Sequence, residues 1–351
     1  MDLIKPVAGL IPTWAASIAV QVAPLQNIDL SVRDTLLPRV GRKPNGDEGT
    51  FITPHGFKYP RVILGGDKFL DYWGKQQNPE LATVEGVHAV MRAAYQRGVR
   101  GFDVSMNQHV IDAYTRLRTE HADAISIGNP NWLCGVKLGD TDIYLLRDRI
   151  LKTLKERCFT ENHWAAIRSL PADRRQRWFE ARSQQSALTP EEIADIYLDE
   201  DVFRAKLTLL EKSADYLAMG SDYSEWLFLL GRGDIVRRMF AVAGEYNMIP
   251  LSLSHWGSVT LPEFSSYPVD GHWVYINQSE SLLDQDTVVR MIRESPLPVT
   301  AFWALGGGVL AGRMEAAFRY LKESGVASVV VGIERLSQVS QTMPLAVEIF
   351  K

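Results

Sequence analysis

The chain has 351 residues, of which 46% are hydrophobic and 23% are charged, as in ordinary globular proteins. Its length suits one large barrel or two ordinary domains, so a sizeable core is available. The net charge is −4 and no basic run stands out, so a nucleic-acid partner has no electrostatic support and is not expected.

Residues 1–58 are predicted to form an N-terminal arm followed by loops. An apolar stretch begins near Pro6 and ends near Leu25, but its leading segment lacks the positive charge of a signal peptide. Pro12, Gln21 and Pro24 interrupt the stretch, which argues against a membrane span. We therefore expect an arm that packs against the domain, and no membrane partner.

Three strands and two helices are predicted between residues 59 and 138. Short apolar runs predict the strands, and apolar residues at helical spacing that end at Gly98 predict the first helix. The predicted strands cover residues 59–64, 101–105 and 124–127, and the predicted helices cover residues 84–96 and 110–120.

Residues 139–200 break this alternation with a charged, helical pattern that contains no predicted strand. Thr189 is expected to cap a helix that starts at Pro190 and has acidic residues in its first turn. Long insertions in a barrel often form lids or subunit contacts. A solvated helical excursion without a role in the chemistry is an equally open interpretation.

Strands and helices alternate again after the insertion. The predicted strands cover residues 215–219, 249–253 and 272–276 with two more inside 297–341, and the predicted helices cover residues 203–213, 235–246, 287–294 and 336–349. Consecutive strand–helix units require parallel strands. Eight such strands predict an α/β fold, a (β/α)8 TIM barrel over residues 59–351 with an N-terminal arm and a helical insertion after strand 3. The missing G-x-G-x-x-G after the first strand disfavours an open doubly wound sheet.

Polar residues gather at the predicted carboxyl ends of the strands, where (β/α)8 barrels carry their chemistry. These residues are Asp67, Lys68, Asp103, Ser105, Asn107, Asn129, Asn131, Ser221, Asp222, Glu225, Ser254, His255, Asn277, Glu280, Glu334 and Arg335. Because such positions are polar in any barrel, their placement alone does not assign a function.

Asp103 and His255 are the sharpest catalytic candidates. Asp103 interrupts an apolar strand, where a carboxylate is costly unless it is paired or functional. His255 follows a strand of Leu and Ser and suits general acid–base chemistry near neutral pH. Glu225 and Asp222 complete the predicted catalytic set. For Asp103 and His255, a purely structural hydrogen-bonding role stays open.

A metal site is the less favoured interpretation of the same region. His109, His255, Asp222 and Glu225 are suitable ligand types, but they follow different strands and have no motif spacing. We therefore predict no metal.

Four tryptophans fall at or just beyond predicted strands three, four, five and seven. They are Trp132, Trp226, Trp256 and Trp303. Four indoles around one mouth would form a large apolar pocket suited to an aromatic, a sugar or a flat cofactor ring. Together with Asn129 and Asn277 they make up the predicted substrate pocket. Alternatively, the indoles pack the end of the barrel.

Two kinds of covalent chemistry are disfavoured. Strands two to eight contain no lysine, which argues against a Schiff-base aldolase. Cys134 has no histidine in its neighbourhood, so a nucleophilic thiol is not expected. Cys134 and Cys158 are also too few for a disulfide framework or a zinc motif, which indicates reduced thiols in a cytoplasmic protein.

Two parts of the chain resemble the aldo/keto reductase superfamily. R-G-V-R-G-F-D, which ends at Asp103, resembles the second strand of that family, which ends in a catalytic Asp. A-L-G-G-G-V-L-A-G and S-G-V-A-S-V-V-V-G-I-E-R-L-S-Q-V-S-Q-T resemble its seventh and eighth strands, where the family binds NADP phosphates. The resemblance implies NADP contacts at Gly306, Gly307, Gly308, Gly332, Glu334, Arg335, Ser337, Gln338 and Gln341.

The chain departs from the family at its catalytic residues, which are Asp, Tyr, Lys and His. Only Asp103 matches, while Gln108 stands in place of the Tyr, Asn129 in place of the Lys and Gly220 in place of the His. Without that Tyr and Lys, the known route for protonating a carbonyl oxygen is missing.

Three functions follow from these observations. The provisional one is an atypical NADP-linked oxidoreductase, which is favoured by the family-like loops G-G-G and G-I-E-R-L-S-Q after strands seven and eight. A non-redox lyase or isomerase acting on a phosphorylated or carboxylate metabolite is the alternative that the missing Tyr, Lys and His favour. The third is a non-catalytic ligand-binding barrel. We expect a small-molecule enzyme, and a homo-oligomer is left open.

Overall fold

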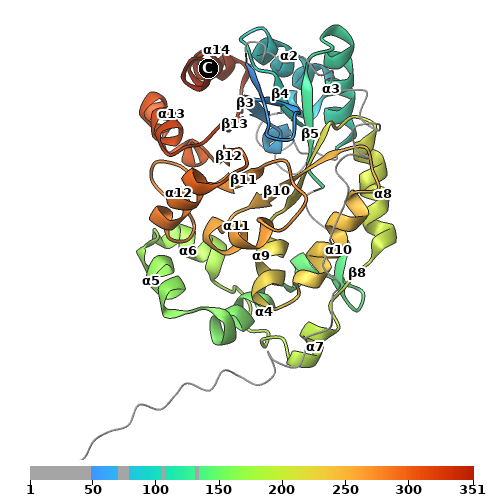
Figure 1. Ribbon diagram of the computed structural model, residues 1–351, viewed down its shortest axis with the longest axis vertical. Coiled ribbons are helices and arrows are strands. Elements are labelled where there is room, and N and C mark those ends of the chain that lie inside the picture. The colour runs from blue at the N-terminus through green and yellow to red at the C-terminus, as the bar shows by residue number, and fades with distance from the viewer. Residues whose placement is uncertain (1–48, 70–78, 105–106, 131–133) are drawn as a thin grey trace, which may run out of the picture. The chain divides into compact units, whose positions relative to one another are not determined.

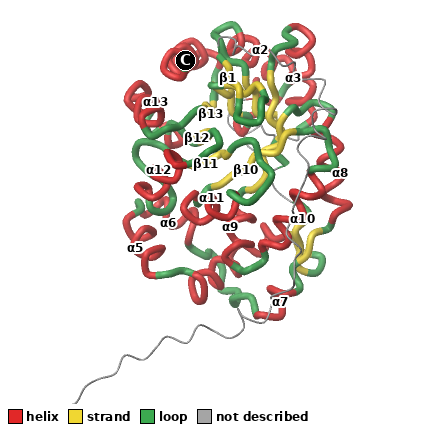
Figure 2. Tube along the Cα trace, in the orientation of Figure 1, coloured by secondary structure: helices red, strands yellow, loops and turns green. Residues whose placement is uncertain are grey.

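The computed structural model describes residues 49–351 apart from 70–78, 105–106 and 131–133. All described residues belong to one compact unit, Arg39–Lys351. Its centre is a closed barrel of parallel strands in the order β10-β11-β12-β13-β3-β4-β5-β9, with helices around it (Figure 1, Figure 2). The barrel strands are β3 (Val62–Gly65), β4 (Gly101–Val104), β5 (Ile125–Gly128), β9 (Tyr216–Gly220), β10 (Ile249–Ser254), β11 (His272–Tyr275), β12 (Val299–Phe302) and β13 (Ser328–Gly332). The predicted (β/α)8 barrel is confirmed.

The last third of the chain closes the barrel. β12 pairs in parallel with β13, with Thr300 opposite Ser328. β13 in turn pairs with β3, the first barrel strand, with Gly332 opposite Gly65. Because every barrel pairing is parallel, all eight carboxyl ends meet at one mouth.

The helices that follow the strands lie close to their predicted ranges. They are α2 (Val84–Tyr95), α3 (Gln108–Glu120), α8 (Glu200–Glu211), α10 (Gly233–Ala243), α12 (Gln285–Glu294), α13 (Met314–Glu323) and α14 (Leu336–Phe350). In α2 the Thr83 hydroxyl accepts from Gly86 N and caps the helix, while Val87, Val90 and Met91 are buried as the periodicity predicts.

Two further helices replace predicted loops. α9 (Asp222–Leu229) follows β9 directly, and α11 (Gly257–Phe264) follows β10. α11 contains Pro262, and α9 follows Ser221, whose φ is 116°. Pro262 argues against a helix in the sequence, which explains why α11 was not predicted. The positive φ of Ser221 is a structural feature that the sequence does not show.

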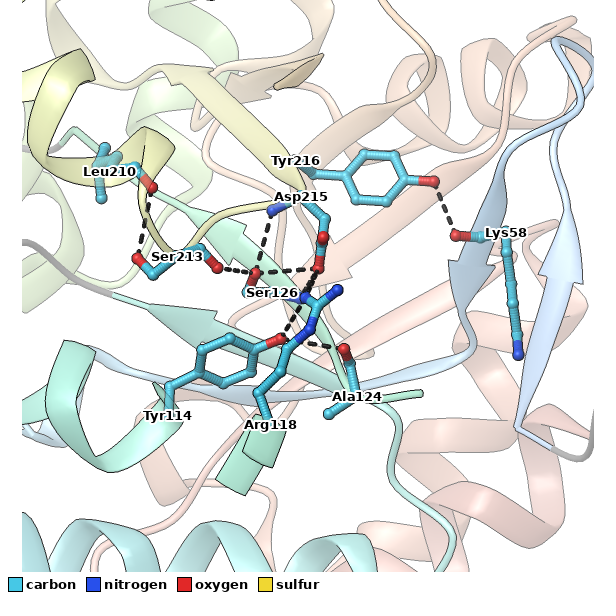
Figure 3. Close-up of polar contacts among 9 residues, drawn as sticks. All are labelled: Lys58, Tyr114, Arg118, Ala124, Ser126, Leu210, Ser213, Asp215 and Tyr216. Carbon is cyan, nitrogen blue, oxygen red and sulfur yellow. Dashed lines mark hydrogen bonds and ion pairs between the residues drawn. The ribbon is translucent and has the colours of Figure 1, made fainter. Parts of the chain in front are cut away.

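A hairpin precedes the barrel in a region predicted as loop. β1 (Thr50–Ile52) pairs antiparallel with β2 (Lys58–Pro60). The Tyr59 hydroxyl lies 3.0 Å from Thr300 Oγ1 and accepts from Trp273 Nε1 at 2.7 Å. The Tyr216 hydroxyl donates to the Lys58 carbonyl at 2.8 Å (Figure 3). Since these partners begin their strands, the hairpin covers the amino-terminal end of the barrel. The arm up to residue 48 lies outside the described residues.

A polar network joins α3 to the amino ends of β5 and β9 (Figure 3). Arg118 Nη1 donates to Asp215 Oδ2 at 2.5 Å and to the Tyr114 hydroxyl at 3.0 Å. The same Asp215 oxygen accepts from Ser126 N at 2.9 Å and Ser126 Oγ at 3.1 Å. The Asp215 carboxylate is therefore buried with a charge partner and several hydrogen bonds.

The insertion segment, residues 139–200, is mostly helical, as predicted. Its helices are α4 (Arg147–Thr153), α5 (Glu161–Ser169), α6 (Ala172–Phe179) and α7 (Pro190–Ala194), with a 3-10 turn at Ile143–Leu146 and a π-turn at Leu154–Cys158. Thr189 Oγ1 accepts from Glu192 N at 3.2 Å, which confirms the predicted cap of α7. The expectation that this stretch has no strand is wrong. A small antiparallel sheet, in the order β7-β6-β8, joins its ends through β6 (Val136–Leu138), β7 (Thr141–Asp142) and β8 (Tyr197–Leu198).

The insertion segment shares a hydrophobic core with the second half of the barrel. Ile150, Leu154 and Phe179 pack in one cluster with Trp226 and Trp256. A second cluster joins β3, β4, β12 and β13 to α2, α3, α13 and α14. Because its apolar side chains are buried in the common core, the insertion segment is an integral part of this unit and not a solvated excursion. Among the described residues, no helix has the length and hydrophobicity needed to cross a membrane.

Candidate active site

Asp103 lies at the carboxyl end of β4 with 6% of its surface exposed. Its Oδ2 accepts a hydrogen bond from Gly66 N at 3.1 Å, while its Oδ1 has no hydrogen-bond partner among the described residues. Burial and the nearby charge of Asp67 raise the pKa of Asp103 to about 7, against the lowering effect of the Gly66 bond. Gly66 must be glycine, because a Cβ there would lie 2.4 Å from the Asp103 carbonyl oxygen.

The charge of Asp67 acts on both Asp103 and His255. Desolvation by the surrounding protein raises the pKa of Asp67, although solvent reaches its side chain, and the charges of His255, Lys68 and Arg177 act in the opposite direction. Asp67 therefore interacts electrostatically with both Asp103 and His255. The two sharpest sequence candidates thus share one mouth.

Asp222, Glu225 and His255 form a compact cluster at the ends of β9 and β10. His255 Nδ1 lies 3.1 Å from Asp222 Oδ1. Glu225 Oε1 accepts from His255 N at 2.6 Å and from Trp256 N at 3.2 Å. Asp222 and Glu225 were expected on a loop, but they lie one helical turn apart on α9.

The protonation of this cluster is set mainly by burial. Glu225 is fully buried, and burial together with the charge of Asp222 raises its pKa well above the usual value. Burial lowers the pKa of His255, although Asp222 and Asp67 favour the imidazolium. The imidazole is therefore neutral at neutral pH, with a nitrogen lone pair available.

Helix α6 of the insertion segment covers the mouth. The Trp178 ring lies 4.9 Å from the His255 ring and 6.0 Å from the Tyr275 ring. Arg177 lies over the rings of Trp178 and Trp303, at 5.4 and 5.2 Å from their centroids. The lid interpretation of the insertion segment is supported by these contacts.

An ion pair fastens α6 to the barrel. Arg174 Nε donates to Glu280 Oε1 at 2.8 Å, and the Tyr275 hydroxyl donates to the same oxygen at 2.7 Å. Sequence reasoning missed Arg174, Arg177 and Trp178. Their only signal was the run R-R-Q-R-W-F, in which an indole follows three arginines closely.

Two of the predicted pocket tryptophans are buried below the mouth. Trp226 and Trp256 are 1% and 2% exposed, and they pack against Tyr144 and Phe179 of the insertion segment. Trp303 is half-buried and stacks on Tyr275 at 5.7 Å. Trp132 lies outside the described residues. Two of the four indoles thus pack the layer between barrel and insertion.

The two predicted pocket asparagines are buried. Asn277 Oδ1 accepts from Ser279 N at 2.9 Å and from Glu280 N at 3.1 Å, which shapes the turn after β11. Asn129 directly follows β5 and is 5% exposed. A role for either residue in substrate binding stays a prediction.

The predicted cofactor loops are only partly open. Gly306, Gly307 and Gly308 all have positive φ, and the last two are exposed. At the start of α14, Gln338 Oε1 accepts from the amides of Glu334 and Arg335 at 2.8 and 3.1 Å. Two amides that could bind a phosphate are therefore already bonded. The remaining predicted contact residues here are exposed, namely Gly332, Glu334, Arg335, Ser337 and Gln341. The Glu334 carboxylate pairs with Lys68 Nζ at 2.7 Å.

The positions that depart from the reductase pattern have local physical reasons. Gly220 has a φ of 125°, and a Cβ there would lie 2.1 Å from the Leu253 carbonyl oxygen, so no side chain fits. Gln108 begins α3 and donates to Asp112 at 2.8 Å on an exposed face. The sequence offered His109 as a possible metal ligand, but its Nε2 donates to the Phe69 carbonyl at 2.7 Å.

The fold and site define a (β/α)8 barrel with carboxylates and an imidazole at its mouth, where they lie close to helix α6 of the insertion segment. A surface hollow also exists outside the barrel, between α13 and α14, but it contains none of these groups. Its lining consists of Glu315, Arg319, Lys322, Glu323, Leu345, Glu348 and Ile349.

No protein-family model matches the chain, and no curated protein matches it. The solved structures to which it is similar include aldo-keto reductases. One from Pseudomonas aeruginosa is 13% identical with a TM-score of 0.49, over 88% of this chain and 98% of that chain. The holo form of one from Bacillus halodurans is 11% identical with a TM-score of 0.49, over 85% and 91% of the two chains.

A glycerol dehydrogenase from Gluconobacter oxydans is 13% identical with a TM-score of 0.45, over 85% of this chain and 90% of that chain. Because these identities are below 25% and the TM-scores below 0.5, the likeness says nothing about the activity of this chain. The site must be interpreted from its own residues.

Proposed function

We propose that this protein is an enzyme that transfers a proton to or from a small molecule bound at the barrel mouth. The observation that carries the proposal is the environment of Asp103, a buried carboxyl group at a strand end with one oxygen left unbonded by the described residues. Its pKa of about 7 suits a group that must both hold and release a proton near neutral pH.

The charges around Asp103 support a lyase or isomerase that acts on an anionic metabolite. Arg177 lies over the Trp303 ring at the mouth, where its charge also acts on Asp67. A guanidinium in this setting can bind a substrate carboxylate or phosphate in two-point fashion. Asp103 would then remove or return a proton on the bound substrate. The cytoplasm, where both free thiols would stay reduced, is the proposed location.

The test is hydrogen exchange at carbon in substrates. Purified protein is incubated in D2O with a panel of phosphorylated and carboxylate metabolites, and loss of C–H signals is followed by NMR. We expect exchange or conversion of one class of compound, and a loss of about 100-fold or more in Asp103→Asn, since general acid–base groups contribute about 10²- to 10⁴-fold.

Asp112→Asn is the matched control, because Asp112 is an exposed acid on α3 that accepts a hydrogen bond from Gln108 and is not one of the candidate site residues. It should keep the wild-type rate. Equal rates in Asp103→Asn and the wild type would contradict the proposal and leave a ligand-binding barrel.

An NADP-linked oxidoreductase is the second candidate. It is favoured by the open space around Gly308 and Gly332, where nothing lies within 4 Å of an added Cβ. Close approach of a dinucleotide requires such space. Titration with NADPH, followed by tryptophan fluorescence, tests it. Saturable quenching through Trp303 is expected for a bound nicotinamide, while no binding at millimolar NADPH would exclude this candidate.

A further inference from the structure

The cluster of Asp222, Glu225 and His255 brings three potential metal ligands together. One ligand atom from each residue lies within 4.8 Å of the other two. Bonds of about 2.1 Å to a shared cation place ligand atoms about 3 to 4 Å apart, so small side-chain adjustments would complete the geometry. The cluster includes an imidazole and is therefore more than a group of surface acids.

Unsatisfied polar atoms in the cluster point to a missing ligand. Glu225 is fully buried, yet its Oε2 has no hydrogen-bond partner in the described part of the chain. Asp222 Oδ1 and His255 Nδ1 are 3.1 Å apart, but neither is placed to form a hydrogen bond with a described residue. Buried polar atoms without partners are costly, and a cation would satisfy all three at once.

We propose that Asp222, Glu225 and His255 bind a divalent transition-metal ion such as Zn²⁺ or Mn²⁺. One imidazole nitrogen and two carboxylates suit these ions, and three protein ligands leave positions open for water or substrate. The bonds from His255 N and Trp256 N to Glu225 Oε1 fix the orientation of this carboxylate. The sequence argued against this site because its residues have no motif spacing.

The charges around the cluster act in both directions. Arg147 interacts with Asp222, and Arg177 with His255, so both guanidiniums oppose a bound cation. Asp67 acts on His255 with the opposite sign. The site thus has three carboxyl groups near two guanidiniums, and a divalent ion would displace the proton that burial favours on Glu225.

Metal binding is measured directly, without a substrate. The full-length protein is treated with EDTA, dialysed and titrated with Mn²⁺ by EPR and with Zn²⁺ against a chromophoric chelator. We expect one ion per chain. Glu225→Gln and Asp222→Asn should each weaken binding by about 100-fold or more, because even outer partners of metal ligands change affinity by about 10- to 100-fold.

Glu263→Gln is the control, since Glu263 is an exposed acid on α11, near the cluster in sequence but not part of it. It should bind as the wild type does. Circular dichroism of each variant identifies loss of folding, and Asp222→Asn keeps the test valid if the buried Glu225→Gln does not fold. No stoichiometric binding to the wild type, or equal affinity in the folded variants, would overturn the proposal.

This inference goes beyond the proposed function, and the two can fail separately. Asp103→Asn should bind the metal normally while losing proton exchange. If the protein catalyses proton exchange but binds no metal, the metal-site proposal is wrong and the proposed function still holds.

Discussion

At two positions near the mouth, the residue type is determined by steric constraints, because a Cβ would clash with a neighbouring backbone oxygen. Gly66 contacts the Asp103 backbone so closely that only glycine fits, and it donates the hydrogen bond that orients the carboxyl group. Gly220 is equally constrained, by the Leu253 carbonyl. The glycine that stands in place of the reductase histidine therefore reflects the local backbone.

Replacing Gly220 tests this constraint. Gly220→Ala combines a positive φ with a Cβ 2.1 Å from a backbone oxygen, and we expect it to destabilise the protein by about 3 kcal/mol or more. Gly231→Ala is the control, because Gly231 has a φ of 76° and nothing within 4 Å of an added Cβ. It should cost only about 1 kcal/mol. Urea denaturation measures both, and equal costs would contradict the steric explanation.

At the level of elements, the two ends of the barrel serve different purposes. The hairpin β1–β2 and the network around Asp215 close the amino end with several buried hydrogen bonds. The carboxyl end instead keeps unbonded polar atoms on Asp103 and Glu225. Satisfied groups stabilise a fold, whereas unsatisfied ones indicate a ligand or a reaction.

The Arg118–Asp215 pair should be important for stability. Arg118→Met leaves the carboxylate of Asp215, which is 4% exposed, without its charge partner. We expect a loss of about 2 to 3 kcal/mol in the free energy of unfolding. Arg319→Met is the matched control, since its pair with Glu315 is 60% exposed on both sides and should matter by less than about 0.5 kcal/mol. Similar losses in the two variants would contradict a special role for the buried pair.

For the molecule as a whole, raised carboxyl pKa values make stability depend on pH. Asp103 has a folded pKa of about 7 and an ordinary unfolded value, so the folded state holds its proton more tightly. The contribution of Asp103 to the free energy of unfolding is therefore fully present below about pH 4 and is lost as the pH rises through about 7. Glu225 acts with the same sign.

Comparing the wild type with Asp103→Asn isolates this contribution. The variant should lose less stability than the wild type between pH 4.5 and 8, by at most about 4 kcal/mol, from about 1.4 kcal/mol for each pKa unit. Urea denaturation at several pH values measures the difference. Parallel pH profiles would show that the Asp103 carboxyl does not change its charge in this range.

The barrel could be predicted from the sequence because its strands are short apolar runs between regular helices. The first predicted strand, residues 59–64, proved to be two elements, since β2 ends at Pro60 and β3 begins at Val62. Asp103 and His255 could be selected from their places at strand ends. The contacts of Trp178 and Arg177 could not, because they depend on how residues 139–200 fold back over the mouth.

The cluster of Asp222, Glu225 and His255 could be considered from the sequence only as the less favoured interpretation, for a related reason. It requires the pairing of β9 with β10 and the unexpected helix α9, which turns Asp222 and Glu225 towards His255. The predicted barrel already places these two strands side by side, but helix α9 was not indicated by local residue spacing. Long-range contacts thus account for most of what the sequence alone did not indicate.

The most direct test of the central claim is the titration of Asp103 itself. Carboxyl ¹³C NMR of protein labelled at aspartate, compared with Asp103→Asn, gives its pKa without any substrate. We predict that one resonance titrates near pH 7 and is missing in the variant. A resonance that titrates near the ordinary value of about 4 would contradict Asp103 as the proton-transferring group.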